Sequence, residues 1–332
     1  MSVASGVGSW PGDDAESYAE ALRVVLGEVS DLPYLPEVPG RGAPAAMIGR
    51  TLATVTDLGF DLQPAGWRLT DAPGIDLRRA RSLLAHDLDQ LEEQAQGLSG
   101  TFKIQVAGPW TLASAVEKPR GDKVLSDHGA RRELAQALAE GLAAHLADVR
   151  RRVPAQRIVV QVDEPALPAV LAGQVPTASG FGRHRTVHPP EASAALETVL
   201  AAAGEEPWVH CCAPGAPWEL LRGAGAHGLS AEVSVLDADD LDALAEHLDS
   251  GGRVALGLVP ALEPVTPPEA TALTERVLRL LDLLGLDLET VSERLVITPA
   301  CGLAGATPAW ARRATELCRE VAHNLSPSSA SA

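Results

Sequence analysis

Residues 157–165 read RIVVQVDEP, an apolar run that ends in two carboxylates and a proline. Residues 101–109 read TFKIQVAGP, a second strand-like run, and a long helical pattern at 129–152 separates the two. Alternation of strand and helix predicts that the two strands pair in parallel. The apolar runs at 158–162 and 254–259 are typical of strands buried on both faces.

Six further segments have an extended pattern: residues 4–9, 32–38, 207–212, 229–235, 253–259 and 294–302. The segment at 32–38 contains more prolines than an ordinary central strand tolerates. Helical patterns, such as those at 239–250 and 267–286, separate most of the segments. Eight such units in one chain favour an α/β fold of the (β/α)8 TIM-barrel type, with a single domain, over an open sheet.

The length of 332 residues fits one such barrel, and the sequence contains neither a short repeat nor an interdomain linker. We therefore expect one domain over residues 1–325 and a disordered tail, SPSSASA, over 326–332. A long irregular stretch at 172–194 follows the fourth strand. Such a stretch can be a functional lid or a plain insertion, and its role stays open.

The formal charge of −17 argues against a nucleic-acid partner, which requires a basic face, and against an anionic membrane surface. The first residues do not form a signal peptide, and no apolar stretch is long enough to span a membrane. We therefore expect a cytoplasmic protein with reduced thiols. Metal binding or catalysis then explains cysteines beside a histidine better than a disulfide does.

A zinc site is the strongest chemical interpretation of the strand ends, because TIM-barrel active sites lie at the carboxyl ends of the strands. His210 and Cys212 are two residues apart on one strand, so their side chains face the same side. Glu232 on the next strand and Cys301 on the last could complete a four-ligand shell. Thiolates, imidazole and carboxylate together suit Zn²⁺. Two thiolates and one carboxylate would give the site a net charge of −1, which favours holding a substrate thiolate over activating water.

Each of these residues also has a simpler explanation. A cysteine is often buried as a small hydrophobic residue, and Glu232 alone could form an ion pair. Cys211 is expected to point away from the others by strand alternation, and Cys318 lies in a helical pattern and is expected to be structural. The zinc interpretation depends on the four residues meeting at one rim.

The adjacent carboxylates Asp163 and Glu164 end the fourth strand, so one of them is expected to face the mouth of the barrel. A carboxylate there could bind a substrate amino group or move a proton, and Asp163 is thus the candidate catalytic residue. The alternative is an ion pair with an arginine at the rim. The stretches at 8–12 and 35–42 offer the backbone groups of turns, and the second also offers the carboxylate of Glu37. Ordinary loop geometry also explains both stretches.

Over nearly its whole length the sequence resembles the C-terminal catalytic barrel of the cobalamin-independent methionine synthase family. The most specific motifs are QVDEPAL (161–167), VHCC (209–212), SAEVS (230–234) and ITPACGL (297–303). The resemblance implies a Zn²⁺ cofactor and carries the family's zinc ligands onto the same four residues: His210, Cys212, Glu232 and Cys301. It also implies that the enzyme methylates the thiol of homocysteine to form methionine.

The resemblance further implies substrate contacts. Ser9, in a GSWP segment where the family has G-S-F-P, would contact the carboxylate of homocysteine. Glu37 and Asp163 would bind its amino group. The residues around Glu37 differ from the family pattern. The segment VAGPWTL (106–112) resembles the family's G-P-x-T segment, which lines the mouth of the barrel.

The methyl donor stays open. Full-length members of the family carry an additional N-terminal barrel that helps to hold the folate donor, and this sequence resembles a short form without it. The donor could be methyltetrahydrofolate or a methylated corrinoid, possibly protein-bound. Other possibilities are a barrel related to uroporphyrinogen decarboxylase, a corrinoid-dependent methyltransferase acting on another thiol, and a non-catalytic zinc- or corrinoid-handling protein.

Overall fold

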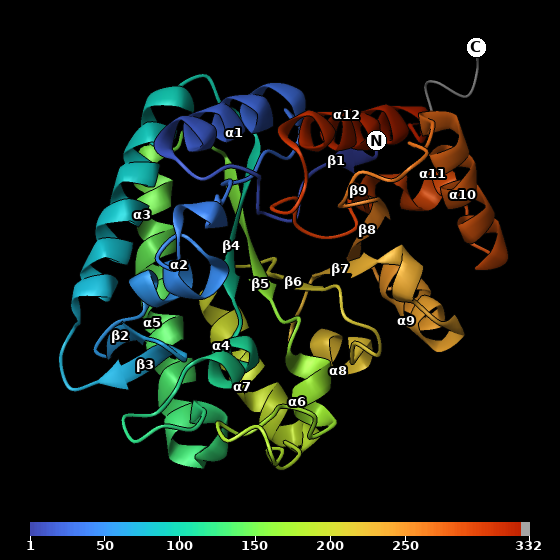
Figure 1. Cartoon of the computed structure of the whole chain (residues 1–332). Helices are drawn as coiled ribbons and strands as arrows, with labels where there is room; N and C mark the ends of the chain where they lie inside the picture. Colours follow the sequence, from blue (N-terminus) through green and yellow to red (C-terminus); the bar gives the residue numbers. More distant parts are fainter. Residues whose placement is uncertain (327–332) are drawn as a thin grey trace.

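The computed structural model describes residues 1–326. Its main sheet is parallel, and along it the strands follow the order β1-β9-β8-β7-β6-β5-β4 (Figure 1). Their bounds are Val3–Ala4 (β1), Leu295–Pro299 (β9), Arg253–Val259 (β8), Gly228–Glu232 (β7), Trp208–Cys211 (β6), Arg157–Asp163 (β5) and Thr101–Ala107 (β4). The predicted α/β fold with parallel pairing is therefore confirmed.

Helices surround these strands, as Figure 1 shows. The long ones are α1 (Ala15–Glu28), α3 (Ile75–Gln94), α5 (His128–Arg152), α7 (Pro189–Ala202), α9 (Ala238–Asp249), α10 (Ala270–Leu283) and α12 (Pro308–Asn324). Shorter ones are α2 (Met47–Thr54), α4 (Pro109–Ala115), α6 (Leu167–Leu171), α8 (Trp218–Gly223) and α11 (Leu288–Val291). Asp14 and Asp127 accept hydrogen bonds from the first turns of α1 and α5, which explains where these two helices begin.

The proline-rich segment at 32–38 lies between β1 and β4 and forms isolated parallel bridges to both sides. Tyr34 pairs with Lys103 of β4, and Glu37 pairs with Ser9 just after β1. The backbone N–H of Lys103 donates to Pro33 O at 2.8 Å, and that of Glu37 donates to Gly8 O at 3.1 Å. Prolines at 33 and 36 have no N–H to donate, which explains why a continuous ladder does not form.

An apolar layer fills one end of the space that the sheet encloses. It consists of Leu32, Val159, Trp208, Ala255 and Val296, with Val3 packed against them. These residues come from β1, β5, β6, β8, β9 and the segment beside β1 and β4, as expected where a sheet curves around a common interior. Gly228, opposite Trp208 in the β6–β7 register, leaves room for the indole, because a Cβ there would lie 2.3 Å from the ring.

The antiparallel hairpin of β2 (Gly59–Gln63) and β3 (Gly66–Thr70) was not predicted. Its signal in the sequence is two short strand-like runs, GFDLQ and GWRLT, separated only by Pro64 and Ala65. The hairpin connects α2 to α3 outside the main sheet.

The remaining expectations about the chain are tested only in part. The stretch between α6 and α7 contains an isolated antiparallel bridge, Pro176 to Arg183, and its role stays open. The predicted disordered tail lies outside the described residues except for Ser326, whose hydroxyl donates to Ala322 O at 3.1 Å. Among residues 1–326, no helix is both long and apolar enough to cross a membrane.

Helix α5 lies so close to the end of α2 that Gly141 is required there. A Cβ at Gly141 would lie 2.0 Å from the carbonyl oxygen of Thr54, whereas a Cβ at Gly27 in α1 would meet nothing within 4 Å. We expect Gly141→Ala to lower the free energy of unfolding by about 1–3 kcal/mol despite the better helix propensity of alanine.

Gly27→Ala is the matched control and should raise the free energy of unfolding by about 0.5–1 kcal/mol, because only helix propensity changes. Urea denaturation followed by circular dichroism measures both values. Equal effects of the same sign would contradict the close approach of α5 to α2.

Candidate functional site

Three of the four predicted metal ligands meet at the carboxyl ends of their strands. One imidazole nitrogen of His210 and the sulfurs of Cys212 and Cys301 all lie within 4.8 Å of one another. The two sulfurs are 3.1 Å apart although 89 residues separate the cysteines in sequence. His210 lies in β6. Cys212 directly follows that strand, and Cys301 follows β9. One nitrogen and two sulfurs within this distance form a donor set that suits Zn²⁺.

The imidazole of His210 is oriented by a neighbouring strand. Its Nδ1 lies 2.9 Å from the hydroxyl oxygen of Ser230, which is directly opposite His210 in the β6–β7 register. The side chain is buried, and its Nε2 has no hydrogen-bond partner among the described residues. A buried polar atom without a partner normally costs free energy, so Nε2 is the atom to expect on a metal ion. Metal-binding histidines are commonly oriented through their other nitrogen in this way.

The thiols of Cys212 and Cys301 lie within hydrogen-bond distance of each other. This contact between the two thiols raises the pKa of Cys212 and lowers the pKa of Cys301. The proximity of His210 lowers the pKa of Cys301 further. One of the two sulfurs is therefore readily held as a thiolate, which is the form that binds a metal.

Glu232 does not belong to this group in the structure. Its carboxylate accepts a hydrogen bond from the hydroxyl of Ser234 at 2.6 Å. The side chain nevertheless lies close enough to Cys212 to raise the pKa of that thiol. Glu232 is the last residue of β7, beside β6, so it lies at the same rim as the other three residues.

The two remaining cysteines lie elsewhere, as predicted. Cys211 is fully buried in the hydrophobic core with its pKa raised to about 12, mainly by burial. Cys318 is fully buried in α12, and burial raises its pKa as well. Both thiols therefore stay protonated and pack as small hydrophobic side chains.

The adjacent carboxylates of β5 have different environments. Glu164 accepts hydrogen bonds from the backbone N–H groups of Trp110 and Thr111 at 2.9 and 2.8 Å and from the hydroxyl of Thr111 at 2.7 Å. Glu164 thus satisfies donors at the start of α4 and has a structural role. Asp163 is buried on the other side of the strand, and its Oδ1 accepts from the amide of Gln161 at 2.7 Å. Burial raises the pKa of Asp163, and the nearby His210, Gln161 and Lys103 oppose that rise.

Glu37 is also buried. Its Oε1 accepts from the amide of Gln105 at 3.1 Å and lies 3.7 Å from Nε of Arg50. Burial raises its pKa, which Arg50, Gln105 and Lys103 oppose. Arg50 also pairs with the fully buried Asp87, to which Arg41 makes two bonds of 2.8 Å. Breaking such a buried charge network is costly, so the network holds the segment that carries Glu37 in place.

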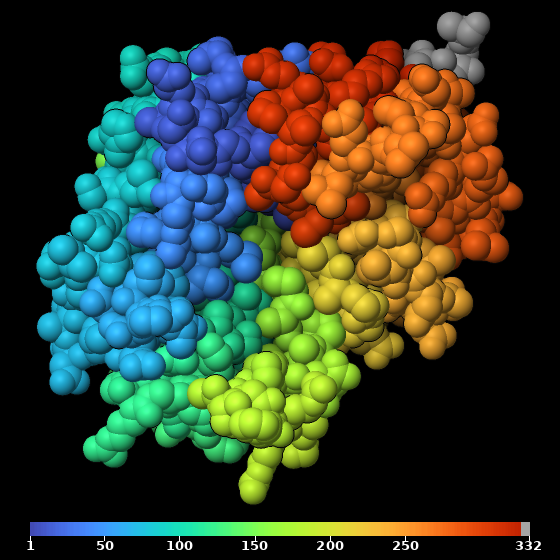
Figure 2. All heavy atoms as spheres, viewed as in Figure 1, coloured from blue at the N-terminus to red at the C-terminus, as the bar shows by residue number. Residues whose placement is uncertain are grey.

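Ser9 lies beside the segment that follows Cys301. Its carbonyl oxygen accepts from the N–H of Leu303 at 2.9 Å, and its hydroxyl accepts from that of Ala304 at 3.3 Å. A Cβ at Gly302 would lie 2.1 Å from the hydroxyl oxygen of Ser9, so the glycine after Cys301 makes room for this contact. The predicted residues from the two ends of the chain therefore lie close together. Atoms from the first, middle and last parts of the chain also meet near the centre of the view in Figure 2.

The polar layer beneath these carboxylates was not predicted from the sequence. Lys103 is fully buried on β4, and its Nζ donates to Gln161 Oε1 at 2.9 Å and to Val7 O at 3.0 Å. Burial lowers its pKa, and the nearby carboxylates of Asp163 and Glu37 oppose that effect. The signal was present in the sequence, because Lys103 and Gln105 alternate with apolar residues, as do Gln161 and Asp163.

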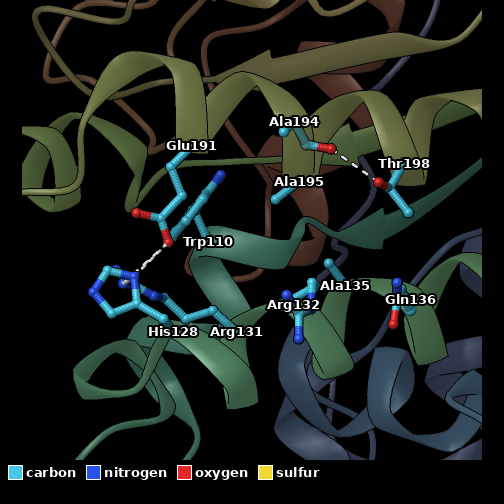
Figure 3. Close-up of a pocket in the computed structure, with 10 residues that line it drawn as sticks. All are labelled: Trp110, His128, Arg131, Arg132, Ala135, Gln136, Glu191, Ala194, Ala195 and Thr198. Carbon is cyan, nitrogen blue, oxygen red and sulfur yellow. Dashed lines mark hydrogen bonds and ion pairs between the residues drawn. The ribbon is translucent and has the colours of Figure 1, made fainter.

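A cavity of about 370 Å³ lies between α5 and α7, outside the main sheet (Figure 3). Its lining includes Trp110, His128, Arg131 and Glu191, and none of the predicted site residues is among them. Glu191 pairs with Arg131 at 3.0 Å and contacts His128 at 3.1 Å. Glu191 therefore compensates the charge of Arg131 in this cavity, which is separate from the candidate metal site.

Comparison with known families gives one match over more than half of the chain. Residues 102–324 match the model of the cobalamin-independent synthase catalytic domain. The chain belongs to this family. Its members are of the methionine synthase type, which supports a methyltransferase enzyme, and the resemblance inferred from sequence motifs is confirmed. The match spans Asp163, His210, Cys212, Glu232 and Cys301.

Other comparisons add little. A search of curated proteins found no matching relative. A putative lyase/mutase from Burkholderia cenocepacia J2315 is similar in structure, with 12% identity, a TM-score of 0.37, and coverage of 93% of this chain and 79% of that one. The carboxyl transferase domain of Rhizobium etli pyruvate carboxylase, solved with pyruvate, has 14% identity and a TM-score of 0.25 over 67% of this chain and 41% of that one. Neither TM-score supports an inference about this chain.

The geometry makes the two neighbouring cysteines a test of the metal site. We expect the protein to bind Zn²⁺. Cys212→Ser and Cys301→Ser should each lower the Zn²⁺ affinity at least about 100-fold, because loss of a metal ligand should cost at least as much affinity as loss of a residue that supports one. Competition with a chromophoric chelator measures the affinity.

Cys211→Ala is the matched control, because Cys211 adjoins a ligand in sequence but lies in the core. It should leave Zn²⁺ affinity unchanged and lower only thermal stability. A loss of zinc from Cys211→Ala as large as that from Cys212→Ser would contradict the assignment.

Proposed function

We propose that this protein is a zinc-dependent methyltransferase that methylates the thiol of homocysteine to form methionine. The observation that carries the proposal is the meeting of His210, Cys212 and Cys301 within 4.8 Å at the strand ends of a chain that belongs to the cobalamin-independent synthase family. Two buried carboxylates, Asp163 of β5 and Glu37 in the segment at 32–38, suit an amino-acid substrate.

His210, Cys212, Cys301 and Glu232 would hold the zinc ion. The first three need little movement, whereas Glu232 would exchange its hydrogen bond from Ser234 for the metal. When bound, zinc lowers the pKa of a substrate thiol and keeps the sulfur nucleophilic. The two cysteine ligands and Glu232 give the site a negative charge, so it favours holding a thiolate over activating water.

The rest of the site would bind the amino-acid part of homocysteine. Glu37 and Asp163 accept hydrogen bonds from its ammonium group, and Ser9 contacts its carboxylate. Burial of both acidic side chains makes each charged hydrogen bond stronger than it would be in water. These contacts fix the sulfur for in-line attack on the methyl group, and such positioning is a large part of what an enzyme contributes to a two-substrate reaction.

The atoms balance in this reaction. The sulfur–methyl bond forms as the bond between the methyl group and its donor breaks. With methyltetrahydrofolate the proton of the thiol ends on the nitrogen that loses the methyl group, and with a methylated corrinoid it is released to solvent. Methyltetrahydrofolate and a methylated corrinoid, free or protein-bound, are both candidate donors.

We also propose that the segment at 32–38 acts as the remaining strand of a (β/α)8 barrel. Its parallel bridges to Lys103 and Ser9 and the place of Leu32 in the interior apolar layer support this. The segment then contributes Glu37 to the mouth of the barrel, as the other strands contribute their last residues.

The charges disfavour a decarboxylase acting on a tetrapyrrole. Such a substrate carries several carboxylates and needs a basic pocket. Here Glu37 and Asp163 offset the nearby charges of Lys103 and Arg50. The proposed ligands Cys212, Glu232 and Cys301 add further acidic groups. An ammonium-bearing substrate complements this arrangement better.

The proposal predicts methionine formation by the zinc-loaded protein. We expect methionine from homocysteine with methyltetrahydrofolate (mono- or polyglutamate) or with methylcobalamin, measured by mass spectrometry with a labelled methyl group. Cys212→Ser should lower the rate at least about 100-fold, because the thiol then lacks its activating site.

Cys211→Ala is again the control and should keep the rate within about twofold, as expected for a substitution that touches no substrate. Methionine from none of the donors would contradict direct synthesis by this protein alone. Equal turnover of homocysteine and simple thiols would contradict the role of the acidic side chains.

A further inference from the structure

Beneath Asp163, a chain of hydrogen bonds runs in one direction. Lys103 Nζ donates to Gln161 Oε1 at 2.9 Å, and Gln161 Nε2 donates to Asp163 Oδ1 at 2.7 Å. Val7 O accepts from both side chains, at 3.0 Å from Lys103 and 2.9 Å from Gln161. Lys103 and Gln161 are each 1% exposed, so water does not compete for these bonds.

Lys103 and Val7 O together fix the direction of this chain, because an ammonium group can only donate and a carbonyl oxygen can only accept. Gln161 must therefore turn its carbonyl oxygen toward Lys103, which leaves its NH₂ group for Val7 O and Asp163. The ammonium is itself held in place, since Nζ also lies 5.4 Å from the centre of the buried Tyr34 ring. Without Lys103, the buried carbonyl oxygen of Gln161 would lose its donor at 2.9 Å, and only the NH₂ group would still hold the amide in place.

The consequence for Asp163 is a fixed orientation. Its Oδ1 is engaged as an acceptor from Gln161, so Oδ2 is the oxygen left to accept from a ligand at the mouth. Glu37 is held in a similar way, because Gln105 Nε2 donates to its Oε1 at 3.1 Å and to Leu35 O at 2.7 Å. A buried glutamine thus supports each of the two carboxylates: Gln161 of β5 supports Asp163, and Gln105 of β4 supports Glu37.

We infer that Lys103 and Gln161 are positioning residues, which set Asp163 to receive the ammonium group of an amino-acid thiol by fixing the direction of its hydrogen bond. The inference rests on the proposed function for the identity of the ligand. It adds a selectivity that the metal ligands do not provide. A thiol without an ammonium group gains nothing from the orientation of Asp163.

Calorimetric binding of two ligands to the zinc-loaded protein tests the inference. The ligands are homocysteine and 4-mercaptobutanoate, which lacks only the amino group. Lys103→Met should raise the Kd of homocysteine about tenfold, as expected when a hydrogen bond to a charged group is misaligned. It should change the Kd of 4-mercaptobutanoate by no more than about twofold, since that ligand does not use Asp163.

A double-mutant cycle separates positioning from general damage. In an Asp163→Asn background, Lys103→Met should change the Kd of homocysteine by no more than about twofold, because the group through which it acts is gone. Lys123→Met is the matched control. Lys123 is a half-buried lysine that donates to Ala115 O at 3.0 Å, and its loss should leave both Kd values unchanged.

The measured Kd values distinguish a failed positioning role from a failed proposed function. The positioning role is overturned if Lys103→Met raises the Kd of both ligands equally. It is also overturned if Lys103→Met raises the Kd of homocysteine by the same factor with and without the Asp163→Asn substitution. If Lys103→Met does not fold, Lys103→Gln removes the charge but keeps a side chain that can donate to Val7 O, and the same comparisons apply. A wild-type protein that binds neither ligand overturns the proposed function, and the inference with it. Wild-type binding with no effect of Lys103→Met overturns the inference alone.

Discussion

Parallel strand pairing is the constraint on which the site depends. In such a sheet all strands end at one edge, and every second side chain faces the interior. The register sets Asp163 opposite His210 and His210 opposite Ser230. This row joins the carboxylate proposed for the substrate, a proposed metal ligand and the hydroxyl that orients it. A shift of one residue in any of these strands would turn its functional side chain into the outer core, where Cys211 lies.

The interior of the sheet changes character from one end to the other. An apolar layer around Trp208 and Val296 excludes water at one end. Lys103, Gln161 and Gln105 form a polar layer above it, and the carboxylates and thiols lie at the mouth. Buried polar groups are costly unless they are paired, and most of the charged groups here are satisfied within the chain. His210 Nε2 is an exception, as are Gln105 Oε1 and Arg50 Nη2, and the two sulfurs within 4.8 Å of a His210 nitrogen are what indicate a metal ligand there.

Much of this arrangement could be predicted from the sequence. Alternation of strands and helices gave the α/β fold, and the two-residue spacing of His210 and Cys212 placed both side chains on one face. To place Cys301 beside His210 and Cys212, the pairing of strands far apart in sequence had to be predicted. Only the expectation of a curved parallel sheet supplied that pairing. Pattern alone did not identify Lys103, because a lysine in a strand is usually read as exposed. Its burial depends on Val7, after β1, and on Gln161 of β5. It also could not give the orientation of Glu232, which a rotatable side chain and a local bond from Ser234 decide.

The central claim is that zinc on these residues holds the sulfur of homocysteine. X-ray absorption at the zinc edge tests it most directly, with and without homocysteine. The account predicts a zinc shell with sulfur from Cys212 and Cys301, nitrogen from His210 and oxygen from Glu232, and one additional sulfur when homocysteine binds. An unchanged sulfur count on addition of homocysteine, or a shell without sulfur, would contradict the account.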